Sequence, residues 1–240
     1  SPFDQWSLGN PINKHMNLIR AIFRFLVNNS IGRKTGMYWL ATNTEMKLLD
    51  FMESGYLYQN GWFKSIEANK SINLKGDAIA WLPYSLLRFF DDRLTHDMTV
   101  LEFGSGASSQ YFSRKVKYIV SIENDRDWYN KLLADKPENL TLILAETRDS
   151  YINIQQQDMR FDLVLVDGEF REECLFKSIK YLSERGVILL DDTNADEFSQ
   201  LFRKMVELGF RYLKFNDFAP IINYNKESTL FYRDSNCLGL

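Results

Sequence analysis

The stretch "VLEFGSGASSQYF", Val100–Phe112, decides the fold class of this 240-residue chain. An apolar run that carries one acid, Glu102, leads into a turn with Gly104 and Gly106, and then into a serine-rich segment. Glycines let the backbone bend tightly and leave room for a ligand beside it, and the serines that follow can cap a helix. A strand, a glycine turn and a helix in this order favour a ligand site at the turn.

The chain alternates strand and helix patterns from Met98 onward. Short runs rich in Val, Ile and Leu are typical of parallel strands buried on both faces. The last two runs follow each other without a helix, which predicts an antiparallel hairpin at the sheet edge. The runs are "TVLEF", "YIVSIE", "LTLILAE", "FDLVLVDG", "GVILLDD", "FRYLKFND" and "STLFYR". We therefore predict an α/β fold with a doubly wound, mostly parallel seven-stranded sheet and an antiparallel C-terminal hairpin.

Residues 1–97 have a different pattern, with helices and irregular connections, and we expect them to form an N-terminal helical or lid segment before a ligand-binding domain at 98–240. The apolar stretch "LIRAIFRFLV" is short and contains Arg20 and Arg24. It predicts an amphipathic helix packed on protein and no stable membrane insertion. The chain does not begin with a signal-peptide pattern, and its two cysteines suit reduced thiols. These features predict a cytoplasmic protein.

The composition is that of an ordinary globular protein, with 45% hydrophobic and 25% charged residues. The formal net charge of −3 gives no electrostatic reason to expect a nucleic-acid partner, because such binding depends on clustered Lys and Arg. The sequence leaves open whether the chain forms oligomers.

Acids recur where the predicted strands end: Glu123, Glu146, Asp167, and Asp191 or Asp192. The carboxyl ends of parallel strands meet at one edge of a sheet, where ligands bind in open α/β folds. We therefore expect these carboxylates to face a common crevice. Any one of them alone could equally be a helix cap, but together with the glycine turn they favour a binding site.

The first of these acids, Glu123, has an informative spacing in the sequence from the glycine turn. Glu123 lies 123 − 104 = 19 residues after Gly104, at the end of the second strand, where a carboxylate can accept hydrogen bonds from both hydroxyls of a ribose. The dinucleotide fingerprint would have a third glycine at Ser109. The pattern predicts a nucleoside-containing ligand.

With these motifs the chain resembles the class I S-adenosylmethionine-dependent methyltransferases over about Thr99–Arg233. "VLEFGSGAS" is similar to their first motif, with Ser108 in place of the usual third glycine, and "VSIENDRDWYNKL" is similar to the segment whose acid holds the cofactor ribose. "FDLVLVDG" and "GVILLDD" resemble the fourth and fifth strands of that family. The resemblance implies S-adenosylmethionine as cofactor. It implies a site made of Glu102, Gly104, Ser105 and Gly106 on the methionine side, Glu123 and Asn124 at the ribose, Ala145 and Glu146 near adenine, and Asp167.

The acceptor is less well defined. No Asn-Pro-Pro-Tyr-like tetrapeptide follows the fourth strand, where "DGEF" stands instead. That absence argues against the usual N-methyltransferases of DNA adenine and of protein glutamine. The resemblance favours O-methylation of a small molecule or of a sugar or glycan acceptor.

Removal of a proton from an oxygen nucleophile would require a base or a metal. We expect Asp167 and Asp192 to be the catalytic residues. A magnesium ion held by Asp167, Asp192 and Asn194 is one hypothesis, and a direct carboxylate base without an ion is the other. Strand-end capping by the same residues also stays open. Contact of Arg171 or Glu169 with the substrate stays open, but we interpret each as part of a solvated surface pair.

Two other functions remain as alternatives. One is a nicotinamide-dinucleotide oxidoreductase, which the missing third glycine and the antiparallel hairpin disfavour. The other is a methyltransferase-like module that binds a ligand without catalysis, and only an activity assay distinguishes that module from an enzyme.

Overall fold

The computed structural model describes residues 47–48, 51–154, 158–194 and 198–240. The chain divides into two compact units, Ser1–Gly55 and Tyr56–Leu240. The amphipathic helix predicted at 18–27 lies outside the described residues. Within the described part of the chain, no helix has both the length and the apolar character that a membrane span requires.

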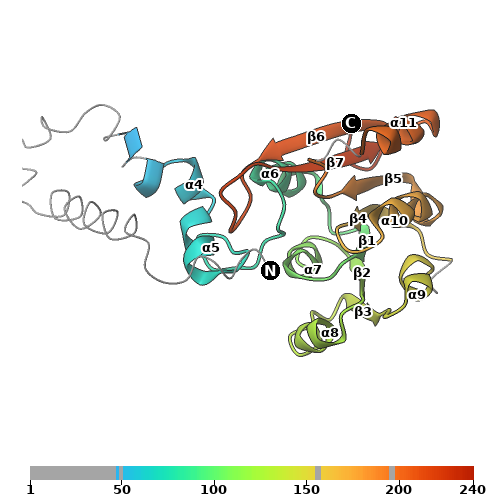
Figure 1. Ribbon diagram of the computed structural model, residues 1–240, viewed down its shortest axis with the longest axis horizontal. Helices are drawn as coiled ribbons and strands as arrows, with labels where there is room; N and C mark the ends of the chain where they lie inside the picture. Colours follow the sequence, from blue (N-terminus) through green and yellow to red (C-terminus); the bar gives the residue numbers. More distant parts are fainter. Residues whose placement is uncertain (1–46, 49–50, 155–157, 195–197) are drawn as a thin grey trace, which may run out of the picture. The chain divides into compact units, whose positions relative to one another are not determined.

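The second unit is built on one seven-stranded sheet with the order β3-β2-β1-β4-β5-β7-β6 (Figure 1). The pairings of β1 with β2 and β4, of β2 with β3, and of β4 with β5 are parallel, whereas β7 runs antiparallel to both β5 and β6. The predicted sheet, including its antiparallel C-terminal hairpin, is confirmed. The strands are β1 (Thr99–Phe103), β2 (Tyr118–Glu123), β3 (Leu140–Leu144), β4 (Phe161–Val166), β5 (Leu182–Leu190), β6 (Arg211–Asp217) and β7 (Lys226–Tyr232).

The register of the central strands places their carboxyl ends level with one another. Phe103, the last residue of β1, lies opposite Ile122 of β2 and Val166 of β4. Val166 in turn lies opposite Leu190, the last residue of β5. The loops that follow these strands therefore emerge side by side at one edge of the sheet.

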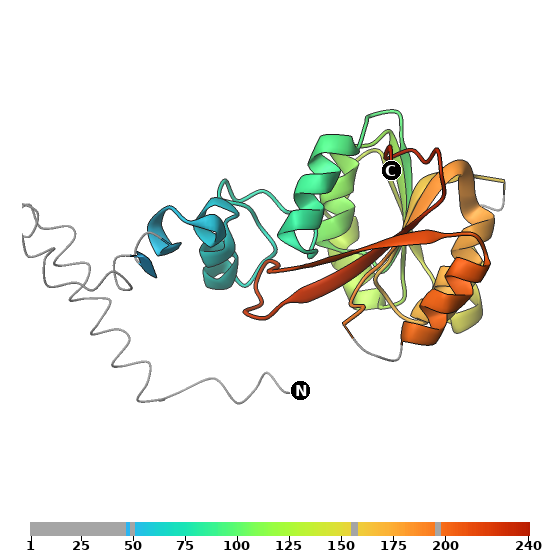
Figure 2. The same cartoon turned by 90° about the horizontal axis from the view of Figure 1, so that it is seen from above.

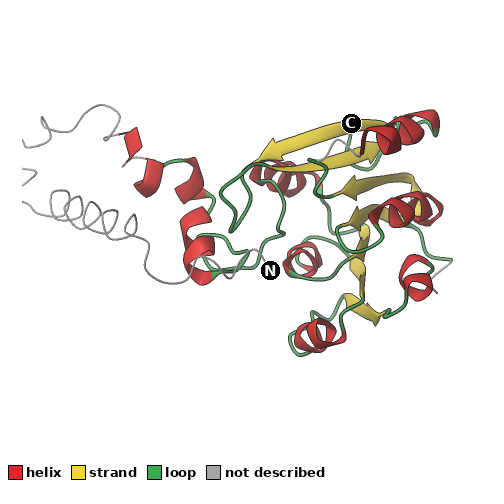
Figure 3. Ribbon diagram, viewed as in Figure 1, coloured by secondary structure: helices red, strands yellow, loops and turns green. Residues whose placement is uncertain are grey.

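Helices cover both faces of the sheet, as the doubly wound prediction requires (Figures 2 and 3). Val100 of β1 packs in a core with side chains of α6 and α7, whereas Leu101 and Phe103 pack in a second core with side chains of α9, α10 and α11. The helices are α4 (Tyr56–Gln59), α5 (Trp62–Ala68), α6 (Tyr84–Arg93), α7 (Ala107–Ser113), α8 (Arg126–Leu133), α9 (Arg148–Ile152), α10 (Arg171–Ser178), the 3₁₀ turn η2 (Ile179–Tyr181) and α11 (Ser199–Glu207).

The domain boundary expected at residue 97 stays a prediction, and residues 56–97 belong to the same compact unit as the sheet. The Trp62 indole donates to the Ile222 carbonyl at 2.6 Å, and the Tyr84 amide donates to the Phe218 carbonyl at 2.9 Å. Both acceptors lie in the connection between β6 and β7. The segment thus covers the C-terminal hairpin.

The fifth strand begins earlier than its apolar run. β5 starts at Leu182, and its pairing with β4 is irregular between Phe161 and Leu163. Gly186 lies at this irregularity, where a Cβ atom would be 2.7 Å from the Phe161 carbonyl oxygen. A bulge accommodates the polar residues that precede the predicted apolar run "GVILLDD".

Candidate ligand site at the carboxyl edge of the sheet

The glycine turn after β1 is a place where two backbones meet. Gly104 has φ 96, in the left-handed region that glycine enters without strain. A Cβ atom at this position would lie 2.8 Å from both the Cα and the N of Gly168, which follows β4. A Cβ on Gly168 would in turn lie 2.0 Å from the hydroxyl of Tyr151. The loops after the first and fourth strands therefore need glycine on both sides.

Gly106 has a different environment. A Cβ atom there would have nothing within 4 Å, so the loop leaves open space above this residue. The Gly106 amide donates to the hydroxyl of Ser109 at 3.0 Å, which fixes the start of α7. The turn therefore combines a close backbone approach at Gly104 with free space at Gly106, as a ligand cradle would.

Glu102 lies beneath this turn and is fully buried. Its Oε2 accepts hydrogen bonds from the hydroxyls of Ser109 and Ser121, the latter at 2.5 Å, whereas Oε1 has no partner among the described residues. Burial raises the pKa of the Glu102 carboxyl to about 7, although the hydroxyls of Ser108, Ser109 and Ser121 act to lower it. A buried acid with one unpartnered oxygen is ready to accept a cationic or hydrogen-bonding group.

The raised pKa makes a prediction about stability. The unfolded chain ionises Glu102 near its ordinary pKa of 4.5, whereas the folded chain ionises it near 7. The contribution of Glu102 to the free energy of unfolding is therefore fully present below about pH 4.5 and is lost as the pH rises through 7. The loss amounts to about 3 kcal/mol at most, at 1.36 kcal/mol for each pKa unit.

Urea unfolding at about pH 5 and about pH 8 should show this loss in the parent protein and not in Glu102→Gln, which keeps the shape but cannot ionise. The difference between the two proteins isolates Glu102 from the other titrating groups. Equal pH slopes for both would contradict the assignment.

Glu123 ties the loop after β2 to the glycine turn. Its Oε2 accepts the Ser105 amide at 3.1 Å, and its Oε1 accepts the amides of Asn124 and Asp125 at 2.8 Å each. The Ala145 amide donates to the Glu123 carbonyl at 2.7 Å. A carboxylate has about four acceptor positions, so Glu123 retains capacity for a ligand hydroxyl beside the turn.

Glu146 is not brought together with the other strand-end acids. β3 ends at Leu144, and the Glu146 carboxylate turns outward to form an ion pair with Arg126 of α8. This hydrogen-bonded pair lowers the pKa of Glu146. Its predicted place near adenine stays a prediction.

The acids after β4 and β5 do converge. Carboxylate oxygens of Asp167, Asp191 and Asp192 all lie within 4.8 Å of one another. The ammonium of Lys226, the first residue of β7, lies 2.7 Å from Asp191 Oδ2 and also contacts Asp192 Oδ1. Asp191 is fully buried and the Lys226 side chain is 7% exposed, so this is an interior ion pair.

Arg171, the first residue of α10, contacts the same cluster of acids. The predicted surface pair of Arg171 with Glu169 is therefore wrong. The Arg171 guanidinium donates to the carbonyls of Gly168, Asp191 and Asp167 at 3.1–3.2 Å and to Asp192 Oδ2 at 3.1 Å. Asp192 is thereby held between two cations. The five N–H donors of an arginine make it suited to joining several loops in this way.

The predicted magnesium ion does not fit this cluster. Three carboxylates already face two cations, and an ion would have to displace the ammonium that contacts Asp191 and Asp192. Asn194 is engaged elsewhere, since its Oδ1 accepts the Glu227 amide at 2.9 Å and its Nδ2 donates to the Asn225 carbonyl at 3.1 Å. Its predicted role as a ligand is therefore not favoured.

The two predicted catalytic acids have opposite electrostatic environments. Burial and repulsion from Asp191 raise the pKa of Asp167 well above its usual range, although Lys226 and Arg171 act to lower it. Burial also acts to raise the pKa of Asp192, but Lys226 and Arg171 outweigh burial and lower it. Asp167 is thus the stronger base of the two, whereas the two cations beside Asp192 favour its charged form.

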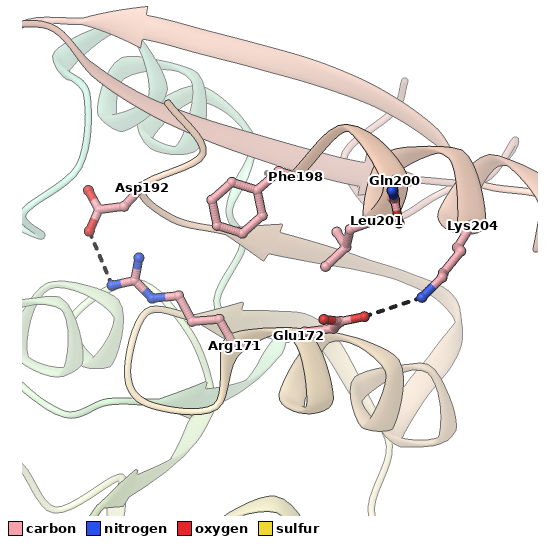
Figure 4. A pocket seen from close by; sticks show the side chains of 7 residues that line it. All are labelled: Arg171, Glu172, Asp192, Phe198, Gln200, Leu201 and Lys204. Atoms are coloured by element: carbon pink, nitrogen blue, oxygen red, sulfur yellow. Dashed lines mark hydrogen bonds and ion pairs between the residues drawn. The ribbon is translucent and has the colours of Figure 1, made fainter. Parts of the chain in front are cut away.

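A pocket of about 460 Å³ opens beside Asp192 between α10 and α11. Figure 4 shows Phe198 and Leu201 between two ion pairs, one of Arg171 with Asp192 and one of Glu172 with Lys204. The volume is in the range of small-molecule sites. Its lining is a balanced mixture of apolar and charged side chains, and also includes Gln200.

Sequence analysis missed Lys226, Tyr151 and Gly168 and misjudged Arg171. The signal for Gly168 was present in "FDLVLVDG", where a glycine follows a strand-end acid. Lys226 gave no local signal, because even Asp192, the nearer of its two acidic partners in sequence, lies 34 residues earlier in the chain.

No protein-family model matches the chain, and a search of curated proteins finds no similar sequence. Three solved structures show a similar arrangement. A precorrin-6y C5,15-methyltransferase from Geobacter metallireducens is 16% identical, with TM-score 0.49, over 68% of this chain and 97% of that one. An rRNA methylase from Streptococcus thermophilus is 14% identical, with TM-score 0.44, over 61% and 92%. A Streptococcus mutans protein in complex with SAH is 12% identical, with TM-score 0.44, over 64% and 99%.

Proposed function

We propose that the chain is an S-adenosylmethionine-dependent methyltransferase that methylates an oxygen of a small-molecule or sugar acceptor. The observation that carries this proposal is the pairing of Glu123 with the Ser105 amide beside the open space at Gly106. It joins a carboxylate suited to ribose hydroxyls to a turn with room for the ligand.

The cofactor would occupy residues of the first three strand ends. Glu123 would accept the ribose hydroxyls, and the turn around Gly106 would accommodate the methionine part. The unpartnered Oε1 of Glu102 supports this assignment, because the cofactor carries a cationic amino group. When bound, the cofactor supplies the electrophilic methyl group, while the protein aligns the acceptor with it.

The acceptor would bind on the β4 and β5 side. Asp167, whose pKa is raised, would take the proton from the acceptor hydroxyl, with Asp192 and Lys226 fixing its surroundings. The pocket beside Asp192 has a balanced charge and an apolar middle, which suits an uncharged ring with polar substituents better than a polyanion. This charge balance supports a small acceptor rather than a nucleic acid.

The test is ligand binding by the parent protein and by two variants. S-adenosylmethionine and S-adenosylhomocysteine at a hundredfold excess over Kd should each stabilise the parent by about 2.7 kcal/mol, or roughly 5–10 °C in Tm. NAD and NADP should give no shift. Glu123→Ala should weaken both sulfur nucleosides roughly 10- to 150-fold, because a charged acceptor is lost.

Glu123→Ala should also lower Tm without ligand, since three backbone amides lose their acceptor. Glu138→Ala, at an exposed acid in the loop before β3, is the matched control and should behave like the parent. Calorimetry on folded parent protein that detects neither sulfur nucleoside would overturn the proposal. Binding without turnover across a panel of phenols and sugars would instead favour the non-catalytic binding module.

A further inference from the structure

One large aromatic side chain beside the glycine turn has no role in the core. Trp128 lies in α8 and is 43% exposed, and no residue of α8 is buried. An indole that remains at the surface exposes a large apolar area to water. The ring therefore keeps an exposed apolar area, beside the glycine turn, that a ligand could cover.

Hydrogen bonds hold this indole in one orientation against the turn. Its Nε1 donates to the Ser105 carbonyl at 2.8 Å, and its backbone amide donates to Asp125 Oδ1 at 2.8 Å. Ser105 and Asp125 both donate their amides to Glu123. Trp128 is thus attached from its ring and from its backbone to the same two loops that meet at Glu123.

We propose that Trp128 forms a wall of the cofactor site and packs against the nucleoside part of S-adenosylmethionine. This inference rests on the proposed function. Ser105 precedes Gly106, its amide binds Glu123 and its carbonyl binds the indole, so a ligand that spans Gly106 and Glu123 would lie beside the Trp128 ring. Because hydrogen bonds already fix the ring, little side-chain freedom is lost when a ligand covers it.

The charge near the ring indicates which part of the cofactor it contacts. The Lys131 ammonium lies 5.6 Å from the centre of the Trp128 ring, within the range of a cation–π contact. A second cation, the sulfonium, would be repelled by Lys131. The uncharged nucleoside is the better partner, so S-adenosylmethionine and S-adenosylhomocysteine should depend on Trp128 equally.

The experiment uses the full chain with Trp128→Leu, Trp128→Phe and the control Trp81→Phe. Trp81 is also exposed, but the centre of its ring lies 5.5 Å from the Lys226 ammonium, at the acid cluster. Trp128→Leu should weaken calorimetric binding of both sulfur nucleosides by about tenfold, the effect expected for loss of one stacking contact. Trp128→Phe keeps a ring and should lose less. S-adenosylhomocysteine should quench the tryptophan fluorescence of the parent and of Trp81→Phe, and the quenching should disappear in Trp128→Phe.

Three results would overturn this inference, and they are distinguishable. If the parent binds neither nucleoside, both the proposed function and the inference about Trp128 fail. If the parent binds, but Trp128→Leu binds equally and Trp128→Phe is still quenched, only the role of Trp128 fails. If Trp128→Leu loses S-adenosylmethionine far more than S-adenosylhomocysteine, the ring serves the sulfonium and the nucleoside assignment is wrong.

Discussion

Replacing Gly104 with alanine should lower the free energy of unfolding by about 2–5 kcal/mol and abolish measurable binding of S-adenosylhomocysteine. Two costs add at this position. The left-handed φ of 96 costs an L-residue about 1–2 kcal/mol. The new Cβ would lie 2.8 Å from the Cα and N of Gly168, and such overpacking typically costs about 1–3 kcal/mol. Backbone cannot give way as a flexible side chain can, so the two loops must separate. Valine would be worse still.

Gly106→Ala is the matched control, two residues away in the same turn. Its φ of 175 is extended backbone, and the new Cβ would meet nothing within 4 Å. This variant should therefore unfold at nearly the parental urea concentration, yet bind the cofactor more weakly because its methyl group enters the space assigned to the ligand. Urea titration and calorimetry on both variants check this. A Gly104→Ala protein as stable as Gly106→Ala would show that the two strand-end loops do not need their close approach.

The fold could be predicted because its signals are local. Each central strand is a run of apolar residues buried on both faces, and the glycine turn directly follows the first run. β1 and β2 have the predicted bounds, 99–103 and 118–123. The start of β5 was missed because polar residues at a bulge interrupt the apolar run.

The site was only partly predictable, because charge pairing depends on residues distant in sequence. Glu123 could be found from its spacing to Gly104, and the convergence of acids after β4 and β5 follows from parallel topology. Their cations could not be found in this way. In the sequence alone Arg171 has the pattern of a surface residue, because its partners come from separate loops. Lys226 is the first residue of β7, whereas the apolar pattern predicted that this strand starts at Ser228. Without those cations, the same carboxylates suggested a metal site.

Replacing Lys226 with methionine should destabilise the protein by about 3–5 kcal/mol, the typical cost of leaving one partner of a buried ion pair alone. The Asp191 carboxylate would remain fully buried, with the Ser228 hydroxyl on Oδ1 at 2.5 Å but no cation on Oδ2. Among the cations of the described residues, Arg171 would remain as the partner of Asp192. A loss of this size corresponds to roughly 6–20 °C in Tm for a chain of this length. Cofactor affinity should change little in the fraction that remains folded, since the predicted cofactor residues lie mainly after β1 and β2.

A double variant separates lost charge balance from lost packing. Lys226→Met with Asp191→Asn removes one charge of each sign and should recover most of the stability, because the uncompensated carboxylate is gone. Lys214→Met is the surface control: its ammonium pairs with Glu227 at 2.9 Å, but its side chain is 41% exposed. Exposed pairs contribute at most about 1 kcal/mol, so this variant should shift Tm by no more than roughly 4 °C. Thermal and urea unfolding of the four proteins gives the comparison. If Lys226→Met is as mild as Lys214→Met, or if adding Asp191→Asn makes it worse, the interior ion pair does not hold the ends of β5 and β7 together. The buried Asp191 carboxylate would then not depend on the Lys226 ammonium for its stability, and the proposed charged support of Asp167 by Lys226 would fail.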